Sequence, residues 1–375
     1  TRPLSSLAFR EDEKAETAAE SANDNDDSGK ETPKEKAEFL ENNEAVTKRT
    51  IVVTADRATP KGTILLSGAN VITMTGATTT AMNTVRKNQD ILVRNNRIVA
   101  IGTTGSLDVP TNTEIMNVSG KYIVPGFVDT HAHWEFRTGD VLEPQNWSLV
   151  TNLAYGVTAG LDVQTSYKDY FTYRDMVETG QSLGQRAFMT GPGVFGNNDF
   201  QSYEQVLAYL KRYSDHYKTK NIKSYLAGNR KQRQWVVKAS KKLGLMPTTE
   251  GGGDMRLDIT HAIDGMHGNE HTLTIAPMYK DVIELYAKTQ TAYTPTLVVQ
   301  YNGVSMVNYF FTRTEVHDNK KLNRFYPHNR LDELTRRRGN WVRDDEFSVD
   351  HIAGAAAALQ RAGGLVGVGG HGELQ

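Results

Sequence analysis

The chain of 375 residues contains no cysteine. This absence excludes disulfide bonds, thiolate zinc sites and cysteine nucleophiles, so any metal must be bound by His, Asp, Glu or a modified Lys. Long apolar runs are also missing, since none approaches the roughly 18 residues that cross a bilayer. We therefore expect no membrane span. The chain also opens without the basic and apolar pattern of a signal peptide.

An excess of one charge is lacking as well. Lys and Arg number 43 against 44 Asp and Glu, which gives a formal net charge of -1 at pH 7. Such a balance provides no electrostatic footprint for nucleic acid or for an anionic membrane. We therefore expect no nucleic-acid partner.

Aromatic residues are scarce near the N-terminus, where one acidic segment stands out. Residues 11–46 hold thirteen Asp or Glu against four Lys, with Phe39 as the only aromatic residue. A segment of this composition cannot bury enough apolar surface to offset its ordering entropy. We predict a disordered acidic linker over 11–50, with a binding tail as the alternative. Residues 1–10 are then the end of a preceding domain.

From Thr63 the sequence turns to short β-rich runs. Turn residues separate these runs, and Asn95-Asn96 lies between two of them at hairpin spacing. This pattern predicts a small β-sandwich domain over residues 51–120.

After Lys121 the pattern alternates between β and α, which predicts a barrel over 121–375. Eight apolar β segments with helical patterns between several of them indicate a (β/α)8 TIM-type barrel. A doubly wound sheet is the alternative, but no Gly-x-Gly-x-x-Gly turn follows a strand. The expected strands are 122–129, 157–162, 187–190, 222–225, 245–249, 265–271, 292–299 and 365–369. The expected helices are 203–217, 232–243, 277–288 and 349–362.

The two ends of the chain suggest a fragment. It begins with Thr1 rather than Met, and it stops at Gln375, directly after the eighth expected strand. We expect a barrel truncated after strand 8 within a longer protein. That protein is periplasmic or secreted if it carries a signal peptide, and cytoplasmic otherwise.

The first expected barrel strand ends in the pair His131-Ala-His133. Side chains alternate along a strand, so both imidazoles face the same way, into the mouth of the barrel. Two neutral imidazoles at this spacing can bind one divalent cation. Two ordinary surface histidines are the alternative, but the apolar strand that leads in favours a metal site.

The residues from Gly120 to His133, GKYIVPGFVDTHAH, resemble the first-strand signature of the amidohydrolase superfamily. The run DILVRNNRIVAIG from Asp90 to Gly102 is similar to the β-sandwich hairpin of the same superfamily. The resemblance covers residues 62–375. It is narrowest to the subgroup related to imidazolonepropionase, which is often fused behind a Tol-type β-propeller. It therefore implies a metal-dependent hydrolase, with an N-terminal propeller in the full-length chain.

The resemblance also implies further metal ligands at other strand ends. Lys223 takes the place of the fourth-strand lysine that is carboxylated in many members, although a solvated surface lysine is the alternative. His271 takes the place of the sixth-strand histidine, with His261 and His267 as competitors. Glu270 is expected to support the strand or to orient a ligand.

Two positions depart from the commonest pattern of the family. Glu250 replaces the fifth-strand histidine, and His371 replaces the eighth-strand aspartate. A carboxylate can bind a metal, and an imidazole can bind a metal or act as general base, so the mechanism survives both changes. We predict both residues as metal ligands and as catalytic groups, with Glu373 as a weaker candidate base.

The resemblance finally implies a reaction class. One or two divalent ions, zinc with iron or manganese as alternatives, activate a water that hydrolyses a non-peptide carbon–nitrogen bond, such as that of a cyclic amide, in a small-molecule substrate. A Xaa-Pro-type dipeptidase and a non-catalytic metal-binding module are the alternatives. The sequence also leaves a homo-oligomer open. The predicted metal ligands are His131, His133, Lys223, Glu250, His271 and His371.

Overall fold

The computed structural model describes residues 8–11, 49–76, 84–134, 142–165, 170–299, 306–336 and 343–371. The chain divides into two compact units, Thr1–Asp56 and Arg57–Gln375. In the first unit, β1 (Ala8–Glu11) pairs antiparallel with β2 (Arg49–Val52). Most of the predicted acidic linker lies outside the described residues.

A five-stranded sheet opens the second unit. Its order is β5-β4-β3-β6, and β7 also pairs with β3. Asn95 and Asn96 join β4 to β5 with backbone φ angles of 47° and 63°, which a tight hairpin turn requires. The described residues of this region form one sheet, and the second layer of the predicted β-sandwich is not among them. The strands are β3 (Thr63–Val71), β4 (Arg86–Arg94), β5 (Arg97–Thr103), β6 (Glu114–Asn117) and β7 (Tyr122–Ile123).

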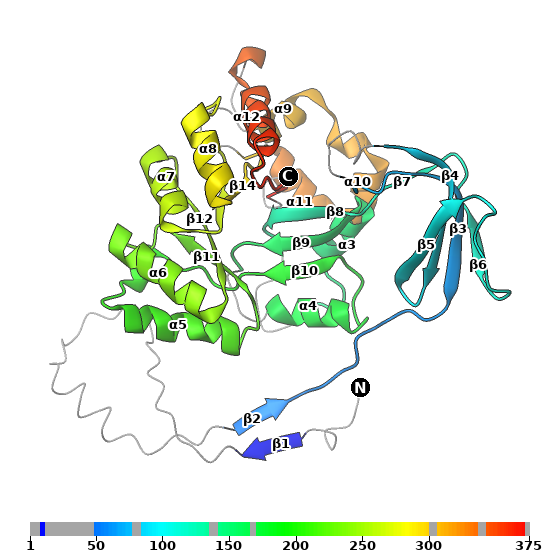
Figure 1. The fold of residues 1–375 in the computed structure, drawn as a ribbon, viewed down its shortest axis with the longest axis horizontal. Helices are drawn as coiled ribbons and strands as arrows, with labels where there is room; N and C mark the ends of the chain where they lie inside the picture. The colour runs from blue at the N-terminus through cyan, green and yellow to red at the C-terminus, as the bar shows by residue number, and fades with distance from the viewer. Residues whose placement is uncertain are drawn as a thin grey trace. The chain divides into compact units, whose positions relative to one another are not determined.

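Two parallel sheets follow, so the rest of the unit is a mixed α/β structure (Figure 1). The first has the order β10-β9-β8, and the second has the order β11-β12-β13-β14. Seven of the eight predicted barrel strands are found, most of them within a few residues of the expected bounds. They are β8 (Phe127–Ala132), β9 (Val157–Asp162), β10 (Arg186–Met189), β11 (Asn221–Tyr225), β12 (Met246–Glu250), β13 (Gly268–Glu270) and β14 (Ala292–Thr294).

Isolated bridges link the two parallel sheets. Val194, beyond β10, pairs with Ser224 in β11. Tyr293 in β14 pairs with Val366, and the backbone N–H of Thr130 in β8 donates to the same C-terminal segment at 3.0 Å. Backbone hydrogen bonds therefore connect the sheets on both sides.

The predicted eighth strand over 365–369 is wrong as a regular strand. The described residues there contain one bridge, at Val366. Glycine occupies positions 363, 364, 367, 369 and 370, and glycine both lacks strand propensity and offers no side chain to pack. The segment instead lies close to β8, where a glycine is required for steric reasons: a Cβ on Gly369 would stand 2.4 Å from the Cβ of His131.

Helices accompany the parallel strands (Figure 1), and several of them contribute apolar side chains to a shared core. Val206 and Leu210 of α5 and Val236 of α6, for example, lie in one core cluster with Ile222 of β11. The helices are α3 (Trp147–Ala154), α4 (Phe171–Glu178), α5 (Tyr203–Asp215), α6 (Arg230–Leu243), α7 (Met255–Asp264) and α8 (Lys280–Thr289), with a 3-10 turn η3 (Gly196–Asn198).

A long helical segment separates β14 from the C-terminal glycine-rich segment. It contains α9 (Met306–Arg313), η4 (Val316–Asp318), α10 (Lys320–Phe325), α11 (His328–Arg336), η5 (Asp344–Glu346) and α12 (Val349–Arg361). Among these, α12 was predicted almost to its bounds. Among the described residues, every helix is too short or too polar to cross a membrane.

Candidate metal centre

His131, in β8, is fully buried and held at two points. Its backbone N–H donates to Asp129 Oδ1 at 3.0 Å, and its ring Nδ1 lies 2.7 Å from Glu270 Oε2. Since a carboxylate accepts, Nδ1 carries the proton and Nε2 keeps its lone pair. Nε2 has no hydrogen-bond partner among the residues that the structure describes. The lone pair of this buried nitrogen is therefore available to bind a metal ion.

His271 follows β13 in a left-handed backbone conformation, with φ of 65°. Its Nδ1 lies 2.8 Å from Thr296 Oγ1, and the same hydroxyl donates to the carbonyl oxygen of Val299 at 2.9 Å. Because the hydroxyl has one proton, Nδ1 donates to it. The Nε2 edge of the ring faces Glu250, whose Oε2 lies 2.9 Å away.

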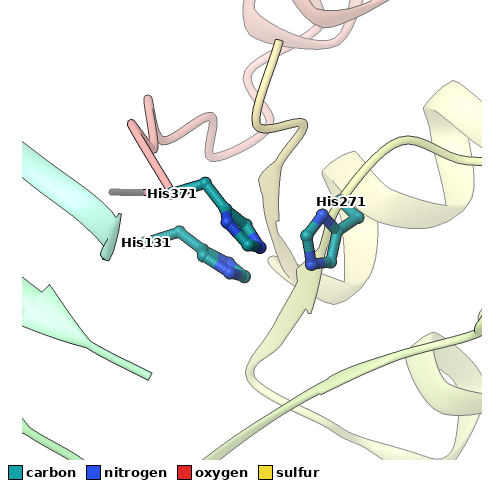
Figure 2. Close-up of side chains that lie close together, drawn as sticks. All are labelled: His131, His271 and His371. Atoms are coloured by element: carbon teal, nitrogen blue, oxygen red, sulfur yellow. The ribbon is translucent and has the colours of Figure 1, made fainter. Parts of the chain in front are cut away.

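His371 also has a positive φ, of 66°, and its backbone N–H donates to the carbonyl oxygen of His131 at 2.8 Å. The ring is stacked on that of His131, with centroids 5.1 Å apart. The potential ligand atoms of His131, His271 and His371 all lie within 4.8 Å of one another, and all three residues are buried. Figure 2 shows the three rings gathered around a common space.

His133 lies at the side of this cluster. Its ring centroid is 5.2 Å from that of His131 and 4.6 Å from that of His371. It is less buried than the other three histidines. The His-x-His pair therefore brings both rings to the same place, as strand alternation predicts.

Lys223 and Glu250 complete the buried polar set. Lys223, in β11, is 2% exposed, whereas Lys218 and Lys220 are exposed. Its Nζ lies 3.3 Å from Glu250 Oε2, and the same oxygen faces His271. A lysine is rarely so buried unless it is paired, so the ion pair with Glu250 explains its position.

Burial keeps His131, His133 and His371 neutral. Desolvation lowers the pKa of His133 to about 2 and that of His371 to about 4, and nearby positive charges act in the same direction. The pKa of His131 is also well below its ordinary value, first through burial and then through the charge of Lys223. Burial raises the pKa of Glu270, against the lowering effect of Lys223 and of the hydroxyl of Thr248. Near pH 7 these imidazoles therefore offer lone pairs.

All six residues predicted as ligands come to one place. The competitors of His271 do not join them, because His261 lies on α7 and His267 is exposed ahead of β13. Glu373 lies outside the described residues. The sequence reasoning missed Thr248 and Thr296, whose hydroxyls bond to Glu270 and His271. Threonine near a strand end carries no spacing signal that could have singled them out.

The donor set fits a divalent cation. Imidazole nitrogens and a carboxylate are the ligands that zinc and its neighbours accept, at about 2.0–2.2 Å. Two ligands at that distance from one ion can lie about 2.9 Å apart, as Glu250 Oε2 and His271 Nε2 do. Two buried imidazole nitrogens, His131 Nε2 and His371 Nδ1, have no hydrogen-bond partner among the described residues. Both are therefore available to bind the ion.

Solved structures of other proteins are similar to this chain in their overall fold. A Xaa-Pro dipeptidase with bound methionine in the active site is similar at a TM-score of 0.57 and 17% identity, over 84% of this chain and 80% of that one. Bottromycin amidohydrolase is similar at a TM-score of 0.56 and 17% identity, over 83% of this chain and 70% of that one. The chain has an amidohydrolase fold. The resemblance predicted from the sequence is therefore confirmed at the level of the fold.

Sequence comparison adds a shorter match. A D-hydantoinase of Streptomyces coelicolor is 31% identical over 67 residues, which is 17% of this chain. The match spans 14% of the length of the hydantoinase. No family model matches the chain.

Proposed function

We propose that the chain is a metal-dependent hydrolase that cleaves carbon–nitrogen bonds other than peptide bonds. The observation that carries this proposal is the convergence of His131, His271 and His371, which come from three distant parts of the chain and place their ligand atoms within 4.8 Å. Surface histidines do not gather in this way, and buried ones are normally satisfied by hydrogen bonds. A metal centre accounts for both features.

The same proposal includes a closed (β/α)8 barrel. The bridge from Val194 to Ser224 joins the two parallel sheets at one side, and the C-terminal segment links β14, through Tyr293 and Val366, to Thr130 of β8 at the other. The glycine-rich segment then occupies the eighth position between β14 and β8 without forming a regular strand. The histidines lie at or beyond the C-terminal ends of their strands, where barrel enzymes carry their chemistry.

His131, His133, His271, Glu250 and His371 would hold the metal, together with Lys223 if that lysine is carboxylated. When bound, a divalent cation lowers the pKa of a water and polarises the substrate carbonyl. Glu270 and Thr296 fix the tautomers of His131 and His271, so that each ring presents Nε2 to the centre.

His371 and Glu250 would move the proton. His371 is neutral near pH 7 because burial lowers its pKa to about 4, so it can accept a proton from the attacking water. The protonated form would then donate to the leaving nitrogen. Glu250 lies 2.9 Å from His271 Nε2 and can take the same proton if His371 is engaged as a ligand.

Lys223 has two states to distinguish. As an ammonium it is paired with Glu250 at 3.3 Å, and as a carbamate it would become an oxygen ligand. We propose the carbamate in the metal-loaded protein. Growth or reconstitution with ¹³C-bicarbonate should give a carbamate carbon resonance in the wild type, and Lys223→Gln should lack it. An unlabelled wild-type protein would show that the ammonium pair persists.

The substrate class rests on the D-hydantoinase match, because a hydantoin is a cyclic amide. The solved Xaa-Pro dipeptidase favours a second candidate, the hydrolysis of a peptide bond to proline. Fold alone does not choose between them.

Metal analysis followed by a substrate panel tests the proposal. We expect the purified protein to contain or to take up zinc, iron or manganese, and to hydrolyse five- or six-membered cyclic amides faster than Xaa-Pro dipeptides. His271→Asn should lose both metal and activity, while His351→Ala, on the exposed side of α12, should lose neither. The reverse substrate preference would favour the dipeptidase. A protein that takes up no metal would contradict both the cyclic-amide hydrolase and the dipeptidase.

A further inference from the structure

A second group of potential metal ligands lies outside the centre described above. His317 in η4, and His328 and Asp332 in α11, bring one ligand atom each to within 4.8 Å of the others. We propose that these three residues form a surface zinc site that clips η4 to α11. The proposal does not depend on the hydrolase function.

The distances favour a shared ion over direct hydrogen bonds. His317 Nε2 lies 3.7 Å from Asp332 Oδ1, and His328 Nε2 lies 3.8 Å from Asp332 Oδ2. Both separations are longer than a hydrogen bond. Ligands placed tetrahedrally at about 2.0–2.1 Å from zinc are roughly 3.4 Å apart, so each of these two distances needs to shorten by only a few tenths of an ångström.

The local sequence explains why the three side chains meet. His328 and Asp332 are four residues apart on α11, so they lie on the same face of the helix, one turn apart. The adjoining face of the helix is anchored, since Leu331, Leu334 and Thr335 are buried. The packing of α11 therefore holds the backbone of the two proposed ligands in place.

The third ligand is held by the turn before α10. The side-chain amide of Asn323 donates to the carbonyl oxygen of His317 and, at 3.0 Å, to that of Asn319. The end of α10 is fixed in turn to α3, where Thr151 Oγ1 donates to the carbonyl oxygen of Phe325. His317 is thus presented by a hydrogen-bonded turn rather than by a free loop.

Zinc is the cation that this donor set favours. Two imidazoles and one carboxylate are a familiar zinc ligand set, and a fourth position is left for water. His317 and Asp332 are about one-third exposed, and His328 is 74% exposed, so an ion can enter from solvent. The helices involved are short, and short helices gain most from a cross-link of this kind.

One neighbour opposes the ion. Arg336 Nη2 lies 3.7 Å from Asp332 Oδ2 and would compete with zinc for the carboxylate. Its side chain is 80% exposed, so it can turn away when an ion enters. Removal of this guanidinium should therefore strengthen zinc binding.

Equilibrium dialysis against zinc with elemental analysis tests the site on the full chain. We expect His317→Ala and His328→Ala each to bind one equivalent fewer than the wild type, and the exposed His351→Ala to match the wild type. All four proteins keep the central histidines, so the difference reports the surface site whatever the central site binds. Equal stoichiometry in wild type and His328→Ala would overturn the proposal.

Two further measurements guard against misfolding and test the geometry. Zinc should raise the melting temperature of His351→Ala more than that of His328→Ala, while the metal-free melting temperatures should agree. Arg336→Gln should bind the surface equivalent more tightly than the wild type does. An unchanged or weaker affinity in Arg336→Gln would contradict the place of Asp332 in the site.

Discussion

Thr296 is a β-branched residue with a backbone φ of 42°, a conformation that such residues rarely adopt. His271 and His371, with φ angles of 65° and 66°, share this feature. Strained residues persist only where their surroundings over-determine them, and they gather at functional sites. Thr296 is fully buried and contacts His271 through its hydroxyl. Its conformation therefore places the hydroxyl where it holds the proton of His271 on Nδ1.

Replacing Thr296 by valine keeps the shape and removes the hydroxyl. His271 Nδ1 would then lose its acceptor, and metal affinity should fall by about 10–100-fold, as it does when an outer partner of a metal-bound histidine is removed. Thr296→Ser retains the hydroxyl and should bind metal nearly as the wild type does. Competition with a zinc chelator gives both affinities. A valine variant with wild-type affinity would show that the hydroxyl has no positioning role.

The neutral histidines make the stability of the metal-free protein dependent on pH. In the folded state the pKa of His371 is about 4 and that of His133 about 2, whereas both titrate near 6.5 when exposed. A depressed pKa stabilises the fold fully above pH 6.5, and this stabilisation is lost as the pH falls from 6.5 toward the folded value. For His371, which is 8% exposed, the loss by pH 4 is about 3 kcal/mol.

Urea denaturation of the metal-free protein between pH 7.5 and pH 4.5 measures this effect. We expect the free energy of unfolding to fall steadily below pH 6.5, and His371→Gln to show a shallower decline because one titrating group is gone. A flat profile down to pH 4.5 would mean that these imidazoles can be protonated in the folded state.

The residues of the site differ in how well they could be predicted from the sequence. The pair His131 and His133 was predicted from strand alternation together with the apolar strand that leads into it. His271, His371, Glu250 and Lys223 required the family resemblance, because each is isolated in the sequence. Thr248, Thr296 and the bond from Glu270 to His131 depend on contacts between strands far apart in the chain, and no local pattern encodes such contacts.

At the scale of elements, the glycine-rich segment after α12 lies against β8 and β14. Gly369 has no room for a side chain, since an added Cβ would meet His131 Cβ at 2.4 Å and Thr294 Cγ2 at 3.0 Å. Both neighbours belong to strands and cannot move easily. The absence of a side chain at this glycine therefore allows the C-terminal segment to approach His131 closely.

Gly369→Ala should destabilise the protein and reduce its metal content, because the new methyl group would displace His131. Gly354 offers a matched control: it lies within α12, and an added Cβ there meets nothing within 4 Å. Gly354→Ala should stabilise the helix by about 0.5–1 kcal/mol. Urea denaturation and zinc analysis compare the two variants. Equal behaviour of both would show that the C-terminal segment packs less tightly than this geometry implies.

The elements themselves were predicted unevenly. Strands β9 to β12 and helices α5, α6 and α12 follow from apolar periodicity and caps, such as Asn229 before α6 and the left-handed Gly244 after it. The helices α3, α4 and α7 were not predicted, because they are short, with 8, 8 and 10 residues. The segment 306–336 was missed for a different reason: its helices are interrupted by exposed charges, and packing rather than local pattern decides their bounds.

At the scale of the whole chain, the division at residue 56 separates two units of different character. The first contains a two-stranded ladder, and such a ladder is marginally stable on its own. The second begins with Arg57, whose side chain pairs with Glu178 at 2.6 Å, and with Ala58, whose N–H donates to the carbonyl oxygen of Glu178 at 2.9 Å. Every residue of both candidate metal sites lies in this second unit.

A chain that begins at Arg57 should therefore keep the melting temperature and the metal content of residues 1–375. The separate peptide 1–56 should show little regular structure by circular dichroism, because two paired strands bury too little apolar surface to offset their ordering entropy. Calorimetry of the shortened chain in the presence and absence of zinc measures the first expectation. If the melting temperature fell by more than a few degrees with the zinc-induced shift preserved, the N-terminal unit would stabilise the fold without contributing to the metal centre. If the zinc-induced shift also disappeared, the metal centre would depend on residues before Arg57, against the division described above.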